Sequence, residues 1–105
     1  MGLIFLLLLS SAQEISSSDI PEEIVNARNE MWGLPLGQRM KIVTTPMLGK
    51  EYVLGPTGEG QGHDSDPIVR YDAYDCLTFV EEAIALSLGE TQQDIDRIRV
   101  DLRYI

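Results

Sequence analysis

The sequence predicts a small α+β domain in which helices dominate. Three observations carry this prediction. Apolar residues recur at helical spacing in several stretches, a short extended piece lies in a glycine-rich loop, and the chain of 105 residues has room for one domain. Its hydrophobic content of 44% is ordinary for a folded globular protein. We therefore expect one domain with a small core.

The first residues form an apolar run, residues 3–9, that is too short to cross a bilayer, which takes roughly 20 apolar residues. The small residues Ser10, Ser11 and Ala12 follow it, although no Lys or Arg precedes it. We expect residues 1–12 to be a signal peptide, 13–20 a polar lead, and 21–105 the domain. This predicts an exported protein, periplasmic or secreted, with no stable membrane anchor after cleavage.

Two helices are predicted in the first half of the domain. Asp19, with Glu22 three residues later, is expected to cap the first, which has Pro21 in its first turn and runs to about Trp32. Its core-facing stripe is predicted to be Ile20, Ile24, Val25, Ala27 and Met31. The second helix carries Leu36, Met40, Ile42 and Val43 and stops before Pro46.

A glycine-rich loop over residues 49–62 separates these helices from the rest of the domain, with a brief extended piece at residues 51–54. Loops of this length are uncommon unless they line a site. A strong helix is then predicted from Tyr74 or Asp75 to about Leu88. Its expected core residues are Phe79, Val80 and Ala83. Thr91 with Asp94 opens a further helix, and residues 100–105 are predicted to begin a strand.

The charges exclude a nucleic-acid partner. The sequence has 17 acidic and 8 basic residues, a net charge of -9, and the acidic residues are scattered along the chain. A phosphate backbone demands a basic stripe, whereas Arg97, Arg99 and Arg103 each have an aspartate nearby. We interpret these arginines and aspartates as a solvated helical face.

Cys76 is the single cysteine, so it cannot form a disulfide within the chain. It follows Asp75 at the start of the predicted amphipathic helix. The positive end of a helix dipole favours thiolate over thiol and makes the sulfur a better nucleophile. Structural packing is the alternative, because free cysteine is among the most often buried residues.

The wider pattern around Cys76 resembles a known family. Residues 48–56 (LGKEYVLGP), 71–81 (YDAYDCLTFVE) and 83–86 (AIAL) are similar to the N-acetylmuramoyl-L-alanine amidase-like family of the NlpC-type, papain-like cysteine peptidases. The resemblance covers about residues 36–105. It implies a papain-like, NlpC-type fold, truncated so that this chain is mostly its helical half, with no cofactor and with peptidoglycan or its peptide fragments as partner.

The resemblance also implies roles for individual residues. It makes Cys76 the nucleophile, Asp75 its helix-cap neighbour, and Tyr52 the upstream tyrosine that helps to hold substrate or the oxyanion. Thr78 and Glu81 match motif positions, and we interpret both as local helix support. The backbone N–H of Cys76 is an oxyanion donor by its predicted place at a helix start.

The general base is missing from this pattern. In the resembled family a histidine follows the cysteine on a later strand, but none is present among the 29 residues after Cys76. His63, the single histidine, precedes Cys76 in the glycine-rich loop; we interpret it as exposed and keep a role as base as a hypothesis. The sequence therefore predicts a truncated piece that ends where the sheet should begin.

The loop has no predicted metal site. Asp64, Asp66 and Asp75 match part of a calcium loop, but Ile68 and Val69 stand where a ligand and a glycine are needed.

The expected function is hydrolysis of an amide bond in cell-wall peptidoglycan through a cysteine nucleophile, and the residues leave open which amide bond is cut. Two alternatives remain: a non-catalytic remnant or cell-wall binding module, and a small helical exported protein with a structural Cys76.

Overall fold

The computed structural model describes residues 20–63 and 66–104. In order, these form α1 (Glu22–Met31), α2 (Leu36–Thr44), a 3-10 turn η3 (Thr45–Met47), β1 (Glu51–Tyr52), β2 (Ala73–Tyr74), α3 (Cys76–Leu88) and α4 (Gln92–Arg103). The two strands pair in parallel, with Glu51 opposite Ala73 and Tyr52 opposite Tyr74. The prediction of a mostly helical α+β domain is confirmed.

The predicted signal peptide and nearly all of the polar lead lie outside the described residues, as do Asp19 and Asp64. Within the described part of the chain, none of the helices has the length and apolar character needed to cross a membrane.

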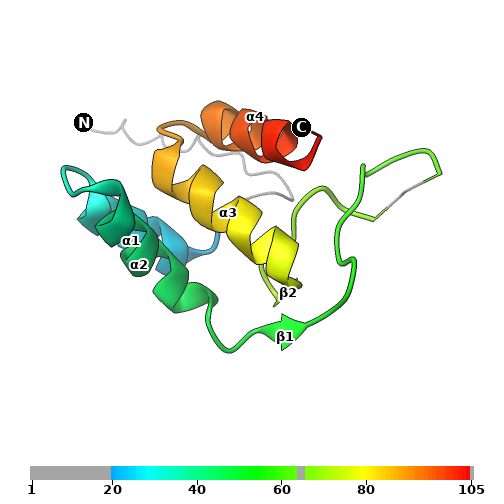
Figure 1. Ribbon diagram of the computed structural model, residues 1–105, viewed down its shortest axis with the longest axis horizontal. Coiled ribbons are helices and arrows are strands. Elements are labelled where there is room, and N and C mark those ends of the chain that lie inside the picture. The colour runs from blue at the N-terminus through cyan, green and yellow to red at the C-terminus, as the bar shows by residue number, and fades with distance from the viewer. Residues whose placement is uncertain (1–19, 64–65, 105) are drawn as a thin grey trace, which may run out of the picture.

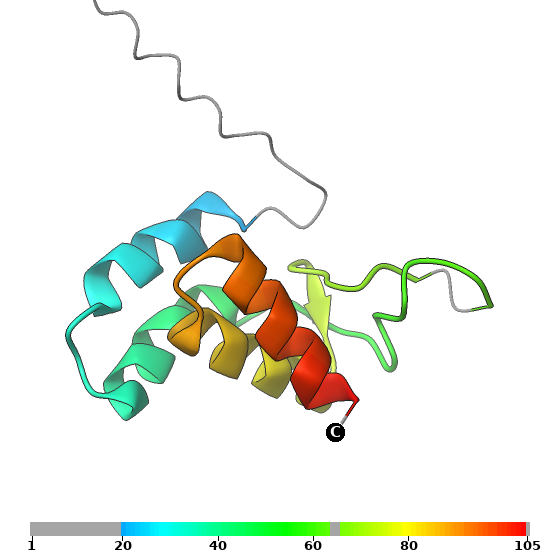
Figure 2. The ribbon, with the colours of Figure 1, turned by 90° about the horizontal axis from the view of Figure 1, so that it is seen from above.

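Helix α3 is the centre of the domain. It packs against α4 on one side and against α2 on the other, with α1 behind α2 (Figures 1 and 2). The far end of the loop between the strands, as far as it is described, projects away from the helices in both views. The buried core comprises Ile24, Ala27, Met31, Val43, Met47, Tyr74, Ala85, Leu86 and Ile95.

Helix α1 buries one stripe, as expected, but its start differs from the prediction. Pro21 is the N-cap and makes no side-chain cap hydrogen bond, whereas the predicted cap, Asp19, lies outside the described residues. Ile24, Ala27 and Met31 are buried, whereas Val25 is exposed. Buried positions three and four residues apart share one face of a helix, and the residue after Ile24 points about 100° away from it.

Helix α2 stops at Thr44, as predicted from Pro46. The chain does not leave helical geometry there, because η3 continues it for one tight turn with Pro46 near its start. Proline is tolerated at this place since the first N–H groups of a helix have no partner within it. The turn buries Met47 against the core and directs the chain into β1.

Two arginines hold the carboxyl end of α3. Arg28 donates from Nη1 to the carbonyl of Leu86 at 2.7 Å and from Nη2 to that of Gly89 at 2.9 Å. Arg39 donates from Nη1 to the carbonyl of Ser87 at 3.2 Å. Positive charge is favourable at a helix carboxyl end, where carbonyls lack partners within the helix. These bonds fix α1 and α2 to the end of α3 opposite Cys76.

Helix α4 begins as predicted and ends differently. The Thr91 side chain accepts from the N–H of Asp94 at 3.1 Å, so Thr91 is the N-cap. The strand predicted over residues 100–105 is wrong, since the helix runs to Arg103 and Ile105 lies outside the described residues. Residues 100–104 alternate apolar and polar, a pattern that suits a strand, but the ion pair of Arg103 with the buried Glu81 favours the helix.

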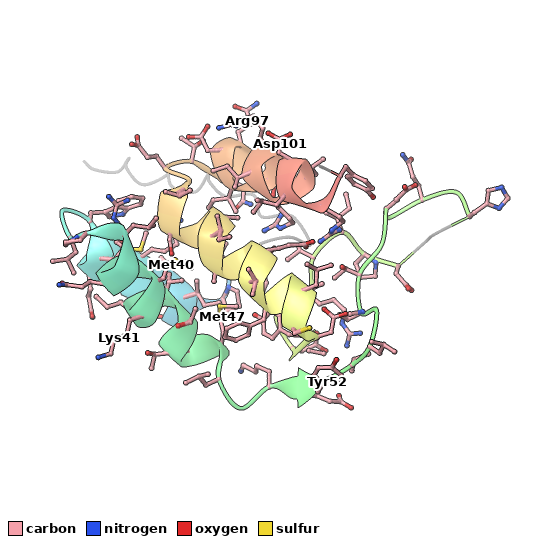
Figure 3. All side chains as sticks on the ribbon, in the orientation of Figure 1. Met40, Lys41, Met47, Tyr52, Arg97 and Asp101 are labelled. Atoms are coloured by element: carbon pink, nitrogen blue, oxygen red, sulfur yellow. The ribbon has the colours of Figure 1, made fainter. Side chains whose placement is uncertain are left out.

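The interpretation of the arginines as one solvated face is wrong for two of the three. The side chains of Arg99 and Glu82 are only 1% and 2% exposed, and they form an ion pair between α4 and α3. Arg103 and Glu81 form a second pair with 14% and 4% exposure. Only Arg97 fits the prediction: it is 62% exposed and, with Asp101, points away from α3 (Figure 3).

The Arg99 pair belongs to a hydrogen-bonded cluster. Arg99 also donates to Asp96 at 2.7 Å and to the hydroxyl of Tyr71 at 3.1 Å, and that hydroxyl donates to Glu82 at 3.2 Å. Burial works to lower the pKa of Arg99, but the hydrogen bond and charge of Glu82 outweigh it and hold the pKa above its ordinary value. Burial raises the pKa of Tyr71, and the Glu82 charge raises it further.

These pairs place two charged residues of α3 in the interior, beside its core residues Ala85 and Leu86. Its two glutamates are buried, whereas Leu77 and Leu88 are exposed and Val80 is 49% exposed. The prediction of Val80 as core is therefore wrong, while that of Ala83 is confirmed and Phe79 is partly buried against the core.

Candidate active site

Cys76 is the first residue of α3, and its side chain is exposed. Asp75 is the N-cap: its Oδ1 accepts from the N–H of Thr78 at 2.8 Å, and the Thr78 hydroxyl accepts from the N–H of Asp75 at 3.0 Å. This reciprocal capping box satisfies two N–H groups and fixes the first turn of the helix. The thiol therefore stands at the positive end of a 13-residue helix whose start is rigidly defined.

The second carboxylate oxygen of Asp75 holds the loop that follows β1. The N–H of Gly55 donates to Asp75 Oδ2 at 3.1 Å. Gly55 has a φ of 61°, in the left-handed region that glycine adopts without strain, so the chain can turn back towards α3 at this residue. The Val53 N–H donates to the Tyr74 carbonyl at 3.0 Å and extends the strand pairing up to this turn.

A hollow of about 260 Å³ lies beside the thiol, between the segment η3–β1 and the start of α3. Cys76 and Tyr52 both line it, with Lys50 and Glu51 on the same side as Tyr52. Tyr52 is 65% exposed on β1, at the edge of the molecule (Figure 3). The structure thus brings the two predicted catalytic residues to one hollow, and their catalytic roles remain predictions.

Apolar and aromatic residues that the sequence analysis did not assign to the site form another part of the wall. Met47, Tyr74 and Phe79 line the hollow, and the rings of Tyr74 and Phe79 meet edge to face at 5.6 Å. Tyr74 lies two residues before Cys76 in the motif, which was a usable signal, whereas nothing in the local sequence marks Met47 as a wall residue.

Tyr74 carries a polar group that the described part of the chain does not satisfy. Its hydroxyl is buried, and no described residue hydrogen-bonds to it. Burial raises the pKa of Tyr74, and the charges of Glu82 and Asp72 raise it further. The phenol is therefore neutral at physiological pH and keeps its proton.

Thr78 and Glu81 differ in how they support the site. The interpretation of Thr78 as local helix support is confirmed by the capping box. Glu81 does not support its own helix: it accepts from Arg103 of α4 at 3.2 and 2.9 Å. The local interpretation of Glu81 is wrong, because the side chain faces α4 and is buried beneath it.

His63 is exposed in the projecting loop and is not among the residues that line the hollow. The described residues include no group of three histidine, cysteine, aspartate or glutamate side chains arranged to hold a metal ion.

The cap predicts a pH dependence of stability. The Thr78 N–H is the main cause that lowers the pKa of Asp75; burial opposes it and the Gly55 N–H adds to it. A carboxyl whose pKa is lower in the folded state stabilises the fold above its unfolded pKa of about 3.9, and loses this contribution as the pH falls through the folded pKa.

Asp75→Asn keeps a capping side chain without the charge. We expect wild type to be more stable than Asp75→Asn by about 0.3–1 kcal/mol at pH 7.

Urea unfolding at pH 7, 5 and 3 measures this difference, which should persist at pH 5 and shrink at pH 3. Asp101→Asn, on the outer face of α4, is the control. A difference between wild type and Asp75→Asn that stays the same at pH 3 would contradict the assignment of the charge effect to this cap.

Fold and site together define a small α+β domain with an exposed cysteine at the amino end of its central helix, next to a largely apolar hollow. Comparison with known protein families matches residues 42–105, more than half of the chain, to the AmiA-like family, described as N-acetylmuramoyl-L-alanine amidase-like. The chain belongs to this family. Comparisons with curated proteins and with solved structures gave no match.

Proposed function

We propose that this chain is part of an exported bacterial cysteine amidase or peptidase of the NlpC-type, papain-like class, which hydrolyses an amide bond in peptidoglycan. One observation carries the proposal: the Cys76 thiol is exposed at the amino end of a capped helix and opens on a hollow that it shares with Tyr52. Family membership supports the amidase chemistry. The leader expected at residues 1–12 supports export.

The reaction follows from the chemistry of a thiol at this place. The Cys76 sulfur attacks the amide carbonyl carbon, and the oxyanion that forms lies near the backbone N–H of Cys76 at the helix start. The carbon–nitrogen bond breaks, and the amine leaves with the proton that the thiol gave up. Water then cleaves the thioester, which releases the acid and restores the thiol. Tyr52 contacts the substrate from the opposite wall of the hollow.

Amide cleavage also needs a group that takes the thiol proton and returns it to the leaving amine. His63 does not line the hollow in the part of the chain that the structure describes. Turnover of an amide therefore requires either a different group that acts as the base or a movement of the loop that brings His63 to the hollow. This observation favours a second candidate function, binding of cell-wall peptides without turnover.

Reaction with an activated aryl ester of N-acetyl-L-alanine tests whether Cys76 is a nucleophile, independently of the base that amide hydrolysis needs. The ester's leaving group departs without a proton, so the nucleophile is tested apart from the base. We expect intact-mass spectrometry to detect an acetylalanyl adduct on wild type and none on Cys76→Ser. At pH 7, Cys76 should also react with iodoacetamide faster than the cysteine of a short unstructured peptide.

Peptidoglycan fragments complete the test. Amide products released by wild type but not by Cys76→Ser support hydrolysis, while an ester adduct with saturable fragment binding and no products supports the binding function. A thiol that forms no ester adduct and reacts no faster than the free peptide would refute the proposal and leave Cys76 as an ordinary exposed cysteine.

A further inference from the structure

Arg103 joins three elements near the start of α3. Its Nε and Nη2 donate to Oε1 of Glu81 at 3.2 and 2.9 Å, and its Nη1 donates to the carbonyl of Gly58 at 3.1 Å. The ion pair is almost entirely removed from water, so it fixes the direction in which the guanidinium fork points. One side chain of α4 thereby holds both α3 and the loop between the strands.

The loop segment that Arg103 holds is the one that contacts the Cys76 site. At its other end, Gly55 donates to Asp75, the helix cap beside the thiol. Gly55 and Gly58 are three residues apart and can span at most roughly 10 Å, so little slack separates the two attachments. Pro56 and Gly58 are buried, and the Gly58 N–H donates to the Pro67 carbonyl at 2.8 Å. A shift at Gly58 is therefore transmitted to Gly55.

We infer that Arg103 is a positioning residue for the Cys76 site, acting through Gly58 and Gly55 on the Asp75 cap. Arg103 does not touch the thiol; it determines how segment 53–58 lies against Asp75. The consequence for catalysis rests on the proposed function, because it assumes that Cys76 is the reacting residue. The structural part of the inference stands independently of catalysis.

The test needs a background in which α3 is not left with an unpaired buried charge. Arg103→Met alone would strand Glu81, at a cost that could unfold the domain. Glu81→Gln removes that charge and leaves Arg103 free to donate to Gly58. We therefore compare Glu81→Gln with the double variant Glu81→Gln/Arg103→Met, which lacks only the arginine, and use Arg97→Met on the outer face of α4 as a surface control.

The main readout is amide hydrogen exchange at Gly55, measured by NMR on the full chain. A typical hydrogen bond corresponds to a change of about five-fold in exchange rate, so we expect Gly55 to exchange about five-fold faster in the double variant than in Glu81→Gln. The amides of α1 should exchange equally fast in both. The rate of Cys76 alkylation by iodoacetamide should also differ between them by more than about two-fold, and Arg97→Met should match wild type.

Equal exchange at Gly55 in the two variants would overturn the inference, and so would faster exchange spread evenly over α1 and Gly55, which marks a purely structural role. Failure of the proposed function has a different signature: wild type forms no ester adduct, while Gly55 still responds to loss of Arg103.

Discussion

Arg99→Met is expected to destabilise the domain by about 3–5 kcal/mol. The substitution leaves the Glu82 carboxylate buried in the interface of α3 and α4, where, among the described residues, only the Tyr71 hydroxyl still donates a hydrogen bond to it. Stabilities of small domains are about 5–15 kcal/mol, so this one change removes a large part of the total. Urea unfolding followed by circular dichroism at pH 7 measures the loss.

Two comparisons make this result specific. Arg97→Met removes exposed ion pairs from the same helix and should cost less than about 1 kcal/mol. Adding Glu82→Gln to Arg99→Met removes the stranded charge and should recover part of the loss. If Arg99→Met costs no more than Arg97→Met, the buried pair does not hold α4 on α3.

The start of the candidate site was predictable because its determinants are local. Asp75, Cys76 and Thr78 lie within four positions, and a capping box needs only that spacing. Thr91 and Asp94 mark the start of α4 for the same reason. The position of Tyr52 across the hollow from Cys76 could be predicted only from the family motif. The two residues are separated by 23 others, and no local spacing rule predicts contact over such a distance.

The buried charges were not predictable from the local sequence. Arg97, Arg99 and Arg103 have similar neighbours along the chain, and only the packing of α4 on α3 separates the exposed residue from the two buried ones. Their partners Glu81 and Glu82 lie beyond a turn, on another helix. The same long-range pairs explain the error at residues 100–105, where alternation favours a strand until Arg103 is seen to face Glu81.

The wrong prediction of Val80 as a core residue has the same cause. A helix with an apolar stripe and two glutamates is ordinarily interpreted as burying the stripe, and this predicted Val80 as core. In α3 the glutamates face inward because arginines of α4 meet them there, so Val80 and Leu77 are exposed. Charged residues can therefore fix which face of a helix is buried when each has a partner.

Gly89→Ala is expected to destabilise the domain by about 1–3 kcal/mol, because the junction of α3 and α4 has no room for a methyl group. A Cβ at Gly89 would lie 2.6 Å from Cγ1, 2.8 Å from the backbone nitrogen and 3.0 Å from Cα of Ile95. Two of these atoms are backbone, so the start of α4 must move. Movement there also disturbs the carbonyl of Gly89 that accepts from Arg28.

Gly37→Ala is the matched control, since a Cβ at Gly37 meets no atom within 4 Å and the residue lies in α2. Alanine there restricts the unfolded chain and favours the helix, so it should stabilise the domain by up to about 0.5–1 kcal/mol. The midpoints of thermal and urea unfolding should therefore fall in Gly89→Ala and rise in Gly37→Ala. Equal effects of the two substitutions would contradict the close approach of α4 to the end of α3.

Because α4 also carries Arg99 and Arg103, a displaced α4 in Gly89→Ala should raise the exchange rate of the Gly55 amide beside Asp75, whereas Gly37→Ala should not.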